Sequence, residues 1–237
     1  MPTRRLLDLG SGTLRVSLWR GDHQVAHLTP YARNNFPPTT IQGVVDQLTA
    51  EGFERAITSA LAPAEQSPFL ENGFSPRHRL ALLTRSLQNV PRDRTVALRR
   101  GRRRDREIAL AIDATAFTGF WRLDSFGLDD ALTATPSSRF RFAMRSRPLG
   151  YAICGRAGTV GYIQRLAVEP GSQRSGLGRA LVSDGLRWMA RRGASQAYVN
   201  TADDNVAALG FYTRLGFDVL PHGLAVLERS LGAAAET

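Results

Sequence analysis

The sequence contains no lysine, only one cysteine and no long apolar run. A single cysteine, Cys154, excludes an internal disulfide and is typical of a reducing compartment, so we expect a cytoplasmic protein. No apolar stretch approaches the length of a membrane span, and the first residues do not read as a secretory signal. We therefore expect no membrane partner, and we expect no bound metal.

Arginine supplies all 31 basic side chains, and the formal net charge is +10. Reliance on arginine alone is typical of codon bias in a GC-rich bacterial genome. The densest cluster is LRRGRRRDRE, residues 98–107. Clustered arginines can neutralise phosphates, but no aromatic residue interleaves with these. We interpret residues 99–106 as a solvated linker and do not expect nucleic acid as a partner, although a nucleic-acid-associated protein stays open as a third interpretation.

The opening stretch LLDLGSGTLRVSLWRGD, residues 6–22, resembles two phosphate- or nucleotide-binding motifs. An actin-like sugar kinase needs a second glycine-rich loop, which is absent. A methyltransferase that uses S-adenosylmethionine needs a helix after the glycines, and here a strand pattern follows. It also needs an acid on the next strand, and residues 23–40 offer no such strand. We interpret residues 6–9 and 13–19 as a β-hairpin around a glycine turn.

The parts on either side of the arginine cluster end alike, with PFLENGFSPRHRLALLTRSL at residues 68–87 and FYTRLGFDVLPHGLAVLERSL at residues 211–231. An aromatic residue, Phe69 or Tyr212, precedes a Gly-Phe pair by the same interval in each. Upstream, EGFERAIT and RGASQAYV both read as helix end, glycine and strand. These matches in one register predict an internal duplication.

The most informative stretch is YIQRLAVEPGSQRSGLGRALVSDGLRWMARRGA, residues 162–194. It predicts a strand, a glycine-rich turn and an amphipathic helix that ends at Gly193. The apolar face of that helix carries Leu177, Leu181, Leu186 and Met189. The unpaired N–H groups of its first turn and the helix dipole would attract a diphosphate.

The turn resembles the acetyl-CoA signature of the GCN5-related N-acetyltransferase (GNAT) family, here formed by Gln173, Gly176 and Gly178. Three further segments follow the family's order: LAVEP, ADDNVAALGFYTRLGF, and a final Gly-Phe with a β-hairpin. The resemblance covers residues 105–231. It implies an α/β GNAT fold, a mixed twisted sheet flanked by helices, whose two central parallel strands splay into a V-shaped cleft. The first half would then be a shortened, degenerate repeat.

The resemblance implies three domain segments and acetyl-CoA as co-substrate. Residues 1–98 would be the degenerate GNAT-like region, residues 99–106 the arginine-rich linker and residues 107–233 the catalytic domain. The strand would bind the pantetheine arm through its backbone, and the amides of the turn would hold the diphosphate. The implied cofactor-binding residues are Leu166, Ala167, Val168, Gln173, Arg174, Ser175, Gly176, Leu177, Gly178, Arg179, Ala180, Asn205 and Tyr212.

Two catalytic positions follow from the resemblance. Tyr212 stands where the family often places the acid that protonates the departing thiolate, although it could simply be a core residue. Asn205 could be only a helix N-cap. Asn200 occupies a position where some relatives that acetylate protein N-termini carry a glutamate, but an amide could only position a water. Glu169, Asp203 and a water relay stay open as the general base.

We therefore expect direct transfer of an acetyl group from acetyl-CoA to a primary amine, either a small molecule or a protein or peptide N-terminus. The alternative is a GNAT-fold sensor that binds acyl-CoA without turnover. The first half is expected to be inactive, because TPYARNNFPPTTIQG lacks the glycine spacing, carries adjacent prolines and is followed by Phe69 in place of a tyrosine. Residues 117–128 should flank the acceptor, and a homodimer stays open.

Overall fold

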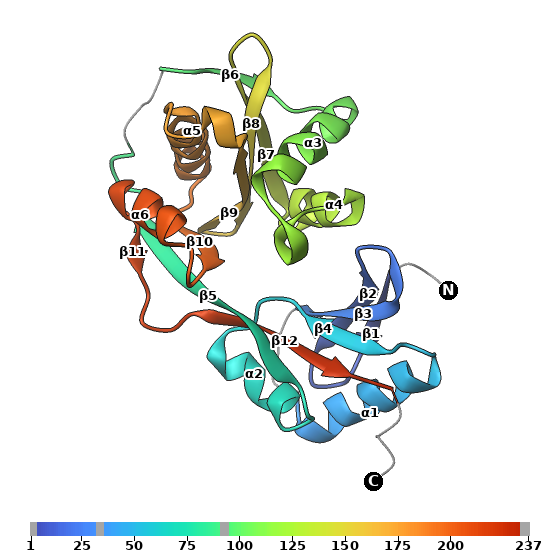
Figure 1. The fold of residues 1–237 in the computed structure, drawn as a ribbon. Helices are drawn as coiled ribbons and strands as arrows, with labels where there is room; N and C mark the ends of the chain where they lie inside the picture. The colour runs from blue at the N-terminus through green and yellow to red at the C-terminus, as the bar shows by residue number, and fades with distance from the viewer. Residues whose placement is uncertain (1–3, 32–35, 91–94, 233–237) are drawn as a thin grey trace. The chain divides into compact units, whose positions relative to one another are not determined.

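The computed structural model describes residues 4–31, 36–90 and 95–232. The chain forms two compact units, each a sheet covered by helices (Figure 1). Unit 1 comprises Met1–Leu82, Thr201–Val206 and Leu220–Thr237, and unit 2 comprises Leu83–Asn200 and Ala207–Val219. Each unit therefore contains residues from both halves of the sequence. The domain boundaries at residues 98 and 107 were inferred from the sequence repeat and the arginine cluster, whereas the two units are defined by contacts in the structure. Those boundaries therefore stay a prediction.

Unit 2 has the strand order β5-β10-β9-β8-β7-β6. Strands β6 to β9 are antiparallel neighbours, and β10 runs parallel to β9. The strands are β6 (Ala97–Arg100), β7 (Ser137–Met144), β8 (Pro148–Ala157), β9 (Val160–Val168), β10 (Gln196–Ala202), and the ends of β5 (Ser75–Ser86) and β11 (Asp218–Val219). The mixed, twisted sheet expected from the sequence is confirmed.

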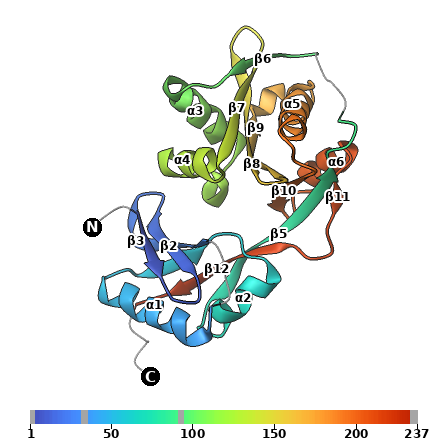
Figure 2. The ribbon, with the colours of Figure 1, turned by 180° about the vertical axis from the view of Figure 1, so that it is seen from behind.

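Helices cover both faces of the unit 2 sheet, as both views show (Figures 1 and 2). Alternation along β8 explains this, because Tyr151 and Ile153 pack with α3 and α4, whereas Ala152 between them packs with α5. The α-helices are α3 (Arg106–Ala116), α4 (Ser125–Thr133), α5 (Leu177–Arg191) and α6 (Val206–Arg214), and the 3₁₀ turns are η1 (Arg103–Asp105), η2 (Gly119–Trp121) and η3 (Pro170–Ser172). Cys154 is buried in β8, as predicted.

Unit 1 has the order β1-β2-β3-β4-β12-β5. Its elements are β1 (Arg4–Asp8), β2 (Thr13–Trp19), β3 (Asp22–Tyr31), α1 (Pro38–Ala50), β4 (Arg55–Thr58), α2 (Pro63–Leu70), β5 and β12 (Leu224–Ser230). The predicted β1–β2 hairpin is confirmed by antiparallel pairing from Arg4↔Ser17 to Asp8↔Thr13. Strand β3 was not identified from the sequence, and within residues 23–31 it carries no acid of the kind a methyltransferase needs. Its polar residues and Pro30 hide a strand pattern that pairing with both β2 and β4 stabilises.

The internal duplication is visible in matched backbone hydrogen bonds. Gly52 and Gly193 both follow a helix with positive φ, at 86° and 87°, and each donates to the carbonyl three residues earlier at 3.0 Å. Gly73 and Gly216 repeat this pattern after α2 and α6, with φ of 75° and 77°. Only glycine adopts this conformation without strain, so the repeated glycines are required by repeated turns.

The predicted C-terminal β-hairpin is wrong. Strands β11 and β12 do not pair with each other, since each pairs with β5, the last strand of the first half. Strand β12 also pairs with β4 in unit 1, while β5 lies next to β10 in unit 2. The two halves thus exchange their final strands. A local sequence pattern does not distinguish this pairing from a hairpin, because apolar and polar residues alternate along each strand in the same way in both arrangements.

The arginine-rich stretch, predicted to be a solvated linker, contains regular structure. Strand β6 pairs with β7 from Ala97↔Met144 to Arg100↔Arg141. The buried carboxylate of Asp105 then accepts hydrogen bonds from Arg99, at 2.9 and 3.1 Å, and from the Arg102 N–H at 2.8 Å. These bonds fix the turn that leads into α3. None of the helices in the described ranges has the length and apolarity needed to cross a membrane.

Candidate functional site

Strands β9 and β10 separate after a short paired segment. Their parallel register covers only Val160↔Gln196, Gly161↔Ala197 and Tyr162↔Tyr198, although β9 continues to Val168. Residues 163–168 therefore have β8 on one side and no strand pairing with β10 on the other. An unpaired strand edge presents backbone donors and acceptors that an extended ligand can use. This is the splayed pair that the fold resemblance implies.

A β-bulge lies at the start of this unpaired segment. Ile153 of β8 faces Arg165, but the next residue, Cys154, faces Ile163, so Gln164 is an extra residue in β9. A bulge bends a strand and redirects the side chains that follow it. After the bulge, Ala167 packs on the α3 face, while Leu166 and Val168 pack near α5. These three predicted pantetheine contacts thus belong to the free part of β9.

The turn between β9 and α5 has an unusual backbone that exposes its amides. Arg174 and Gly176 both adopt positive φ, 58° and 86°. The Ser175 hydroxyl donates to the Ser172 carbonyl at 2.6 Å. The side-chain Nε2 of Gln173 donates to the Val168 carbonyl at 3.3 Å. Residues 173–176 are exposed, and a side chain added at Gly176 would meet open space. The turn is therefore ordered by its own bonds and open to a ligand.

Helix α5 begins directly after this turn. Gly176 is its N-cap, and its first intrahelical bond joins the Ala180 N–H to the Gly176 carbonyl at 3.0 Å. The amides before Ala180 have no carbonyl four residues earlier within the helix, so they are the donors that bind anions at helix N-termini. Leu177 and Ala180 are buried, whereas the side chain of Arg179 is exposed.

Helix α6 packs against the start of α5. A Cβ on Gly178 would lie 3.4 Å from the ring of Phe211 and 3.8 Å from Val168 Cγ2. The end of β9, the beginning of α5 and α6 therefore meet around Gly178. Three segments separated in sequence, each with a predicted cofactor-binding residue, are brought together by this contact.

Tyr212 follows Phe211 and is buried, with 6% exposure. Its ring makes edge contacts with Phe211 and Phe217, at centroid distances of 5.1 and 5.5 Å. Burial raises the pKa of its hydroxyl well above the ordinary value, and the Cys154 thiolate form would raise it further. Tyr212 is thus both a core aromatic residue and a hydroxyl that keeps its proton at neutral pH.

The other polar candidates are divided between the two units. Asn200 is exposed near the end of β10 in unit 2. Asn205 belongs to unit 1, where its N–H donates to the Ala202 carbonyl at 3.0 Å just before α6. Asp203 is an exposed residue of unit 1, and its N–H donates to the Arg79 carbonyl at 3.2 Å.

Glu169, the candidate base after β9, is held in an ion pair. Its carboxylate accepts two hydrogen bonds from Arg147, at 2.5 and 2.7 Å. These bonds lower the pKa of Glu169 below its ordinary value. A carboxylate with a lowered pKa holds a proton poorly, so this pairing disfavours Glu169 as a general base.

Sequence reasoning missed a buried polar cluster at the loop between α3 and α4. Asp113 is fully buried and accepts two bonds from Arg165 at 2.7 and 2.8 Å, one from the Tyr151 hydroxyl at 2.7 Å, and one from the Leu123 N–H at 2.7 Å. Arg165 also donates to the Trp121 carbonyl at 2.6 Å. The sequence could have indicated this cluster, because Asp113 stands within the apolar pattern of residues 106–116 and a buried charge needs a partner.

The aromatic residues of the expected acceptor segment, residues 117–128, have different environments. The Arg165 guanidinium lies 3.6 Å from the centroid of the Phe117 ring, which fixes that ring against the cluster. Phe120 and Trp121 are half-buried and stack edge to face at 5.1 Å. Phe126 is 46% exposed. Among the described residues, no group of His, Cys, Asp and Glu could hold a metal ion.

Comparison with known proteins gives consistent matches. Residues 108–217 match the profile of the Acetyltransferase (GNAT) family. A mycothiol acetyltransferase from Amycolatopsis mediterranei is 48% identical over 58 residues, which are 24% of this chain and 19% of that protein. Another, from Frankia alni, is 30% identical over 155 residues, 56% of this chain and 45% of that protein. The chain spans less than half the length of these curated relatives.

Solved structures match nearly the whole chain. A tandem GNAT protein from the clavulanic acid biosynthesis pathway has a TM-score of 0.71 at 12% identity, and the match covers 99% of this chain and 85% of that one. A GCN5-related N-acetyltransferase from Kribbella flavida has a TM-score of 0.63 at 19% identity, covering 98% and 91%. At such identities the likeness shows the fold. Residues 108–217 thus form an acetyltransferase (GNAT) family segment, and with its turns repeated in both halves the chain carries the GNAT fold in tandem.

Proposed function

We propose that the protein transfers an acetyl group from acetyl-CoA to a primary amine. The match to the family profile supports acetyl transfer in general. The observation that carries the specific proposal is the open edge of β9, which leads directly into an exposed turn with free amides at the start of α5. An extended pantetheine arm fits the first feature, and a diphosphate fits the second.

The cofactor would lie along residues 166–180. The backbone of Leu166 to Val168 would pair with the pantetheine amides. Within residues 173–180, the amides of residues 174–179 would hold the diphosphate, because the Gln173 and Ala180 N–H groups already donate to the Pro170 and Gly176 carbonyls. Arg174 and Arg179 would add positive charge. Tyr212 completes the proposed contacts within unit 2, and the cofactor contact of Asn205, a residue of unit 1, stays a prediction from the resemblance.

The reaction would be direct. A neutral amine attacks the thioester carbonyl, a C–N bond forms, and the C–S bond breaks. A backbone N–H near Val168 would polarise the carbonyl oxygen. The thiolate takes a proton from Tyr212, and the new ammonium group loses one to a water that Asn200 could position.

The raised pKa of Tyr212 has two consequences for this step. The hydroxyl is protonated at neutral pH and so can donate. The tyrosinate left behind would be buried, which is costly, so the proton must return quickly from water or from the acceptor ammonium.

A second function is a sensor that binds acyl-CoA without turnover. The pairing of Glu169 with Arg147 favours it, because it disfavours the carboxylate that follows β9 in the role of base. The first half is proposed to support either function without binding cofactor. Pro37 and Pro38 occupy the N-cap and first position of α1, where they remove two of the amides that an anion would need.

Calorimetry with CoA tests the binding site. Gly176→Glu places a negative side chain at the start of α5, and we expect it to abolish measurable binding. Gly158→Glu is the matched control, because Gly158 also has positive φ, 56°, and open space around it. Equal CoA affinity in folded Gly176→Glu and Gly158→Glu would remove this turn as the site.

Thiol release with a panel of amines separates the two functions. The panel should contain small-molecule amines, peptides with free N-termini and mycothiol-related amines, the last because of the names of the curated relatives. Release of CoA with any member supports transfer. Tight CoA binding with no release from the whole panel favours the sensor.

A further inference from the structure

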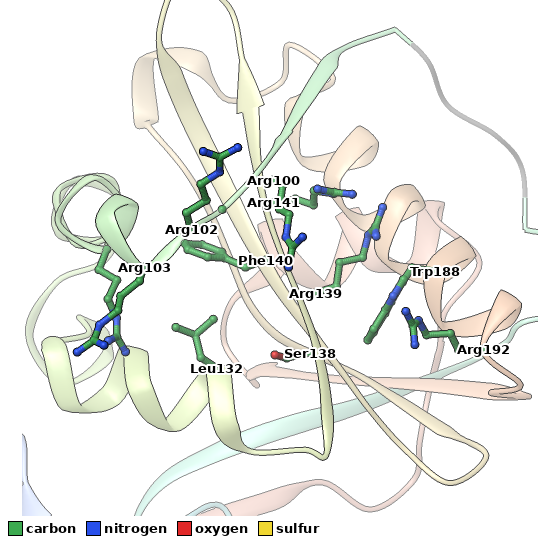
Figure 3. A pocket seen from close by; sticks show the side chains of 12 residues that line it. Arg100, Arg102, Arg103, Leu132, Ser138, Arg139, Phe140, Arg141, Trp188 and Arg192 are labelled. Carbon is green, nitrogen blue, oxygen red and sulfur yellow. The ribbon is translucent and has the colours of Figure 1, made fainter.

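A hollow lies at the edge of the unit 2 sheet where β6 and β7 end the strand order (Figure 3). Its volume is about 740 Å³. It differs from the proposed transfer site, because β8 separates β7 from β9. Strands β6 and β7, the turn before α3 and the end of α5 contribute its arginines, which are Arg100, Arg102, Arg103, Arg106, Arg139, Arg141 and Arg192. We call this hollow the arginine pocket.

Positive charge in the arginine pocket exceeds the negative charge that faces it. Asp184 pairs with Arg139 at 2.6 Å and with Arg141 at 3.5 Å. Arg106 pairs with Asp129. The other four arginines of the pocket form no ion pair within the described ranges, so two carboxylates pair with three of the seven guanidinium groups.

The pocket is partly preorganised. The bidentate bond to Asp184 fixes the Arg139 side chain, which is 18% exposed. The Arg192 guanidinium lies over the Trp188 ring at 5.4 Å. Burial, and then the charge of Arg139, lower the pKa of Arg141. The repulsion between positive charges held this close together decreases when an anion binds beside them.

We propose that the arginine pocket binds a small ligand carrying two or more phosphate groups. Guanidinium groups match phosphate oxygens with paired, charge-assisted hydrogen bonds. The volume lies in the range of small-molecule sites. A nucleic-acid backbone needs a groove that follows it over several nucleotides, whereas these arginines line one hollow. The phosphates could come from a nucleoside triphosphate or from an inorganic polyphosphate.

Calorimetry at constant ionic strength tests the proposal, with inorganic tripolyphosphate and ATP as the probes. Every protein in the comparison also carries Gly176→Glu, so that the transfer site does not contribute, and CoA is left out because its own phosphate groups would compete for the arginine pocket. The pocket variant is Arg103→Gln with Arg192→Gln. Its matched control is Arg104→Gln with Arg191→Gln, which removes the same charge from neighbouring exposed positions that do not line the pocket.

We expect tripolyphosphate to bind, and its affinity to fall at least about tenfold in the pocket variant and less than about twofold in the control. Equal affinity for ATP assigns recognition to the phosphates alone, and tighter ATP binding adds a contact with the base or sugar. Both results uphold the pocket.

Three results would overturn the proposal. They are no binding by the protein that carries Gly176→Glu alone, equal losses in the two double variants, and binding of a 20-nucleotide single-stranded RNA that tripolyphosphate does not displace. The last would assign the surface to nucleic acid. If the pocket variant does not fold, Arg192→Gln against Arg191→Gln makes the same comparison. No outcome depends on acetyl transfer.

Discussion

The buried pair of Asp113 and Arg165 should be strongly coupled. Asp113 has no exposed surface, and the Arg165 side chain is 14% exposed. Arg165→Met would leave a buried carboxylate without its main partner, which typically costs about 3–5 kcal/mol. Asp113→Ala would leave a guanidinium that can still donate to the Trp121 carbonyl and turn toward water, so we expect about 3 kcal/mol.

The double variant separates the pair from its surroundings. With both charges gone, the loss should be smaller than the sum of the two single losses by at least about 2 kcal/mol. Part of the loss remains, because the Tyr151 hydroxyl and the Leu123 N–H lose their acceptor.

Urea denaturation followed by circular dichroism measures each unfolding free energy. The exposed pair of Arg147 and Glu169 is the control, because solvent screens it, and the same cycle there should show no coupling beyond the error of measurement. Additive losses at Asp113 and Arg165, or equal coupling in both pairs, would refute the reasoning.

Three further outcomes follow from the structure. Tyr212→Phe keeps the buried ring, so CoA affinity and melting temperature should change little, while kcat for the best acceptor falls by roughly 10²-fold or somewhat less; an unchanged kcat would make Tyr212 a packing residue. Burial lowers the pKa of His27 to about 4. Between about pH 6.5 and pH 4 the imidazole is therefore protonated in the unfolded chain but neutral in the folded protein, so up to about 3 kcal/mol of stability should be lost as the pH falls through this range. Denaturation across that range should show a shallower loss for His27→Gln, and parallel curves would argue against this role. A Cβ on Gly185 would lie 2.3 Å from the Cys154 sulfur, so Gly185→Ala should destabilise the protein by about 1–3 kcal/mol, and adding Cys154→Ala should restore most of that, which thermal melts of the single and double variants would check.

Local features of the site were predictable because each depends on neighbouring residues. The helix over residues 177–191 follows from apolar spacing, and its start from the glycines of the turn. The structure adds that Gly176 adopts positive φ and that Gly178 packs under Phe211. The repeat was predictable for the same reason, since equal turns require glycine at equal positions.

Long-range features were beyond the sequence. The arginine stretch reads as a solvated linker until β7 is known to pair with it and to supply Arg139, Arg141 and Phe140. The absence of aromatic residues in residues 98–107 is real, but the fold brings Phe140 and Trp188 to the same hollow.

By itself the sequence determined the family resemblance, the duplication and the position of the glycine-rich turn, because each depends on the spacing of residues that are close together along the chain. Only the tertiary structure decided that β5 and β12 end in sheets that hold strands of the opposite half, that Asp113 captures Arg165, and that seven arginines share one hollow. Strand pairing and charge neutralisation depend on which distant residues are placed side by side. A hairpin and an exchanged strand have the same alternation, so their difference lies in the partners that the fold provides.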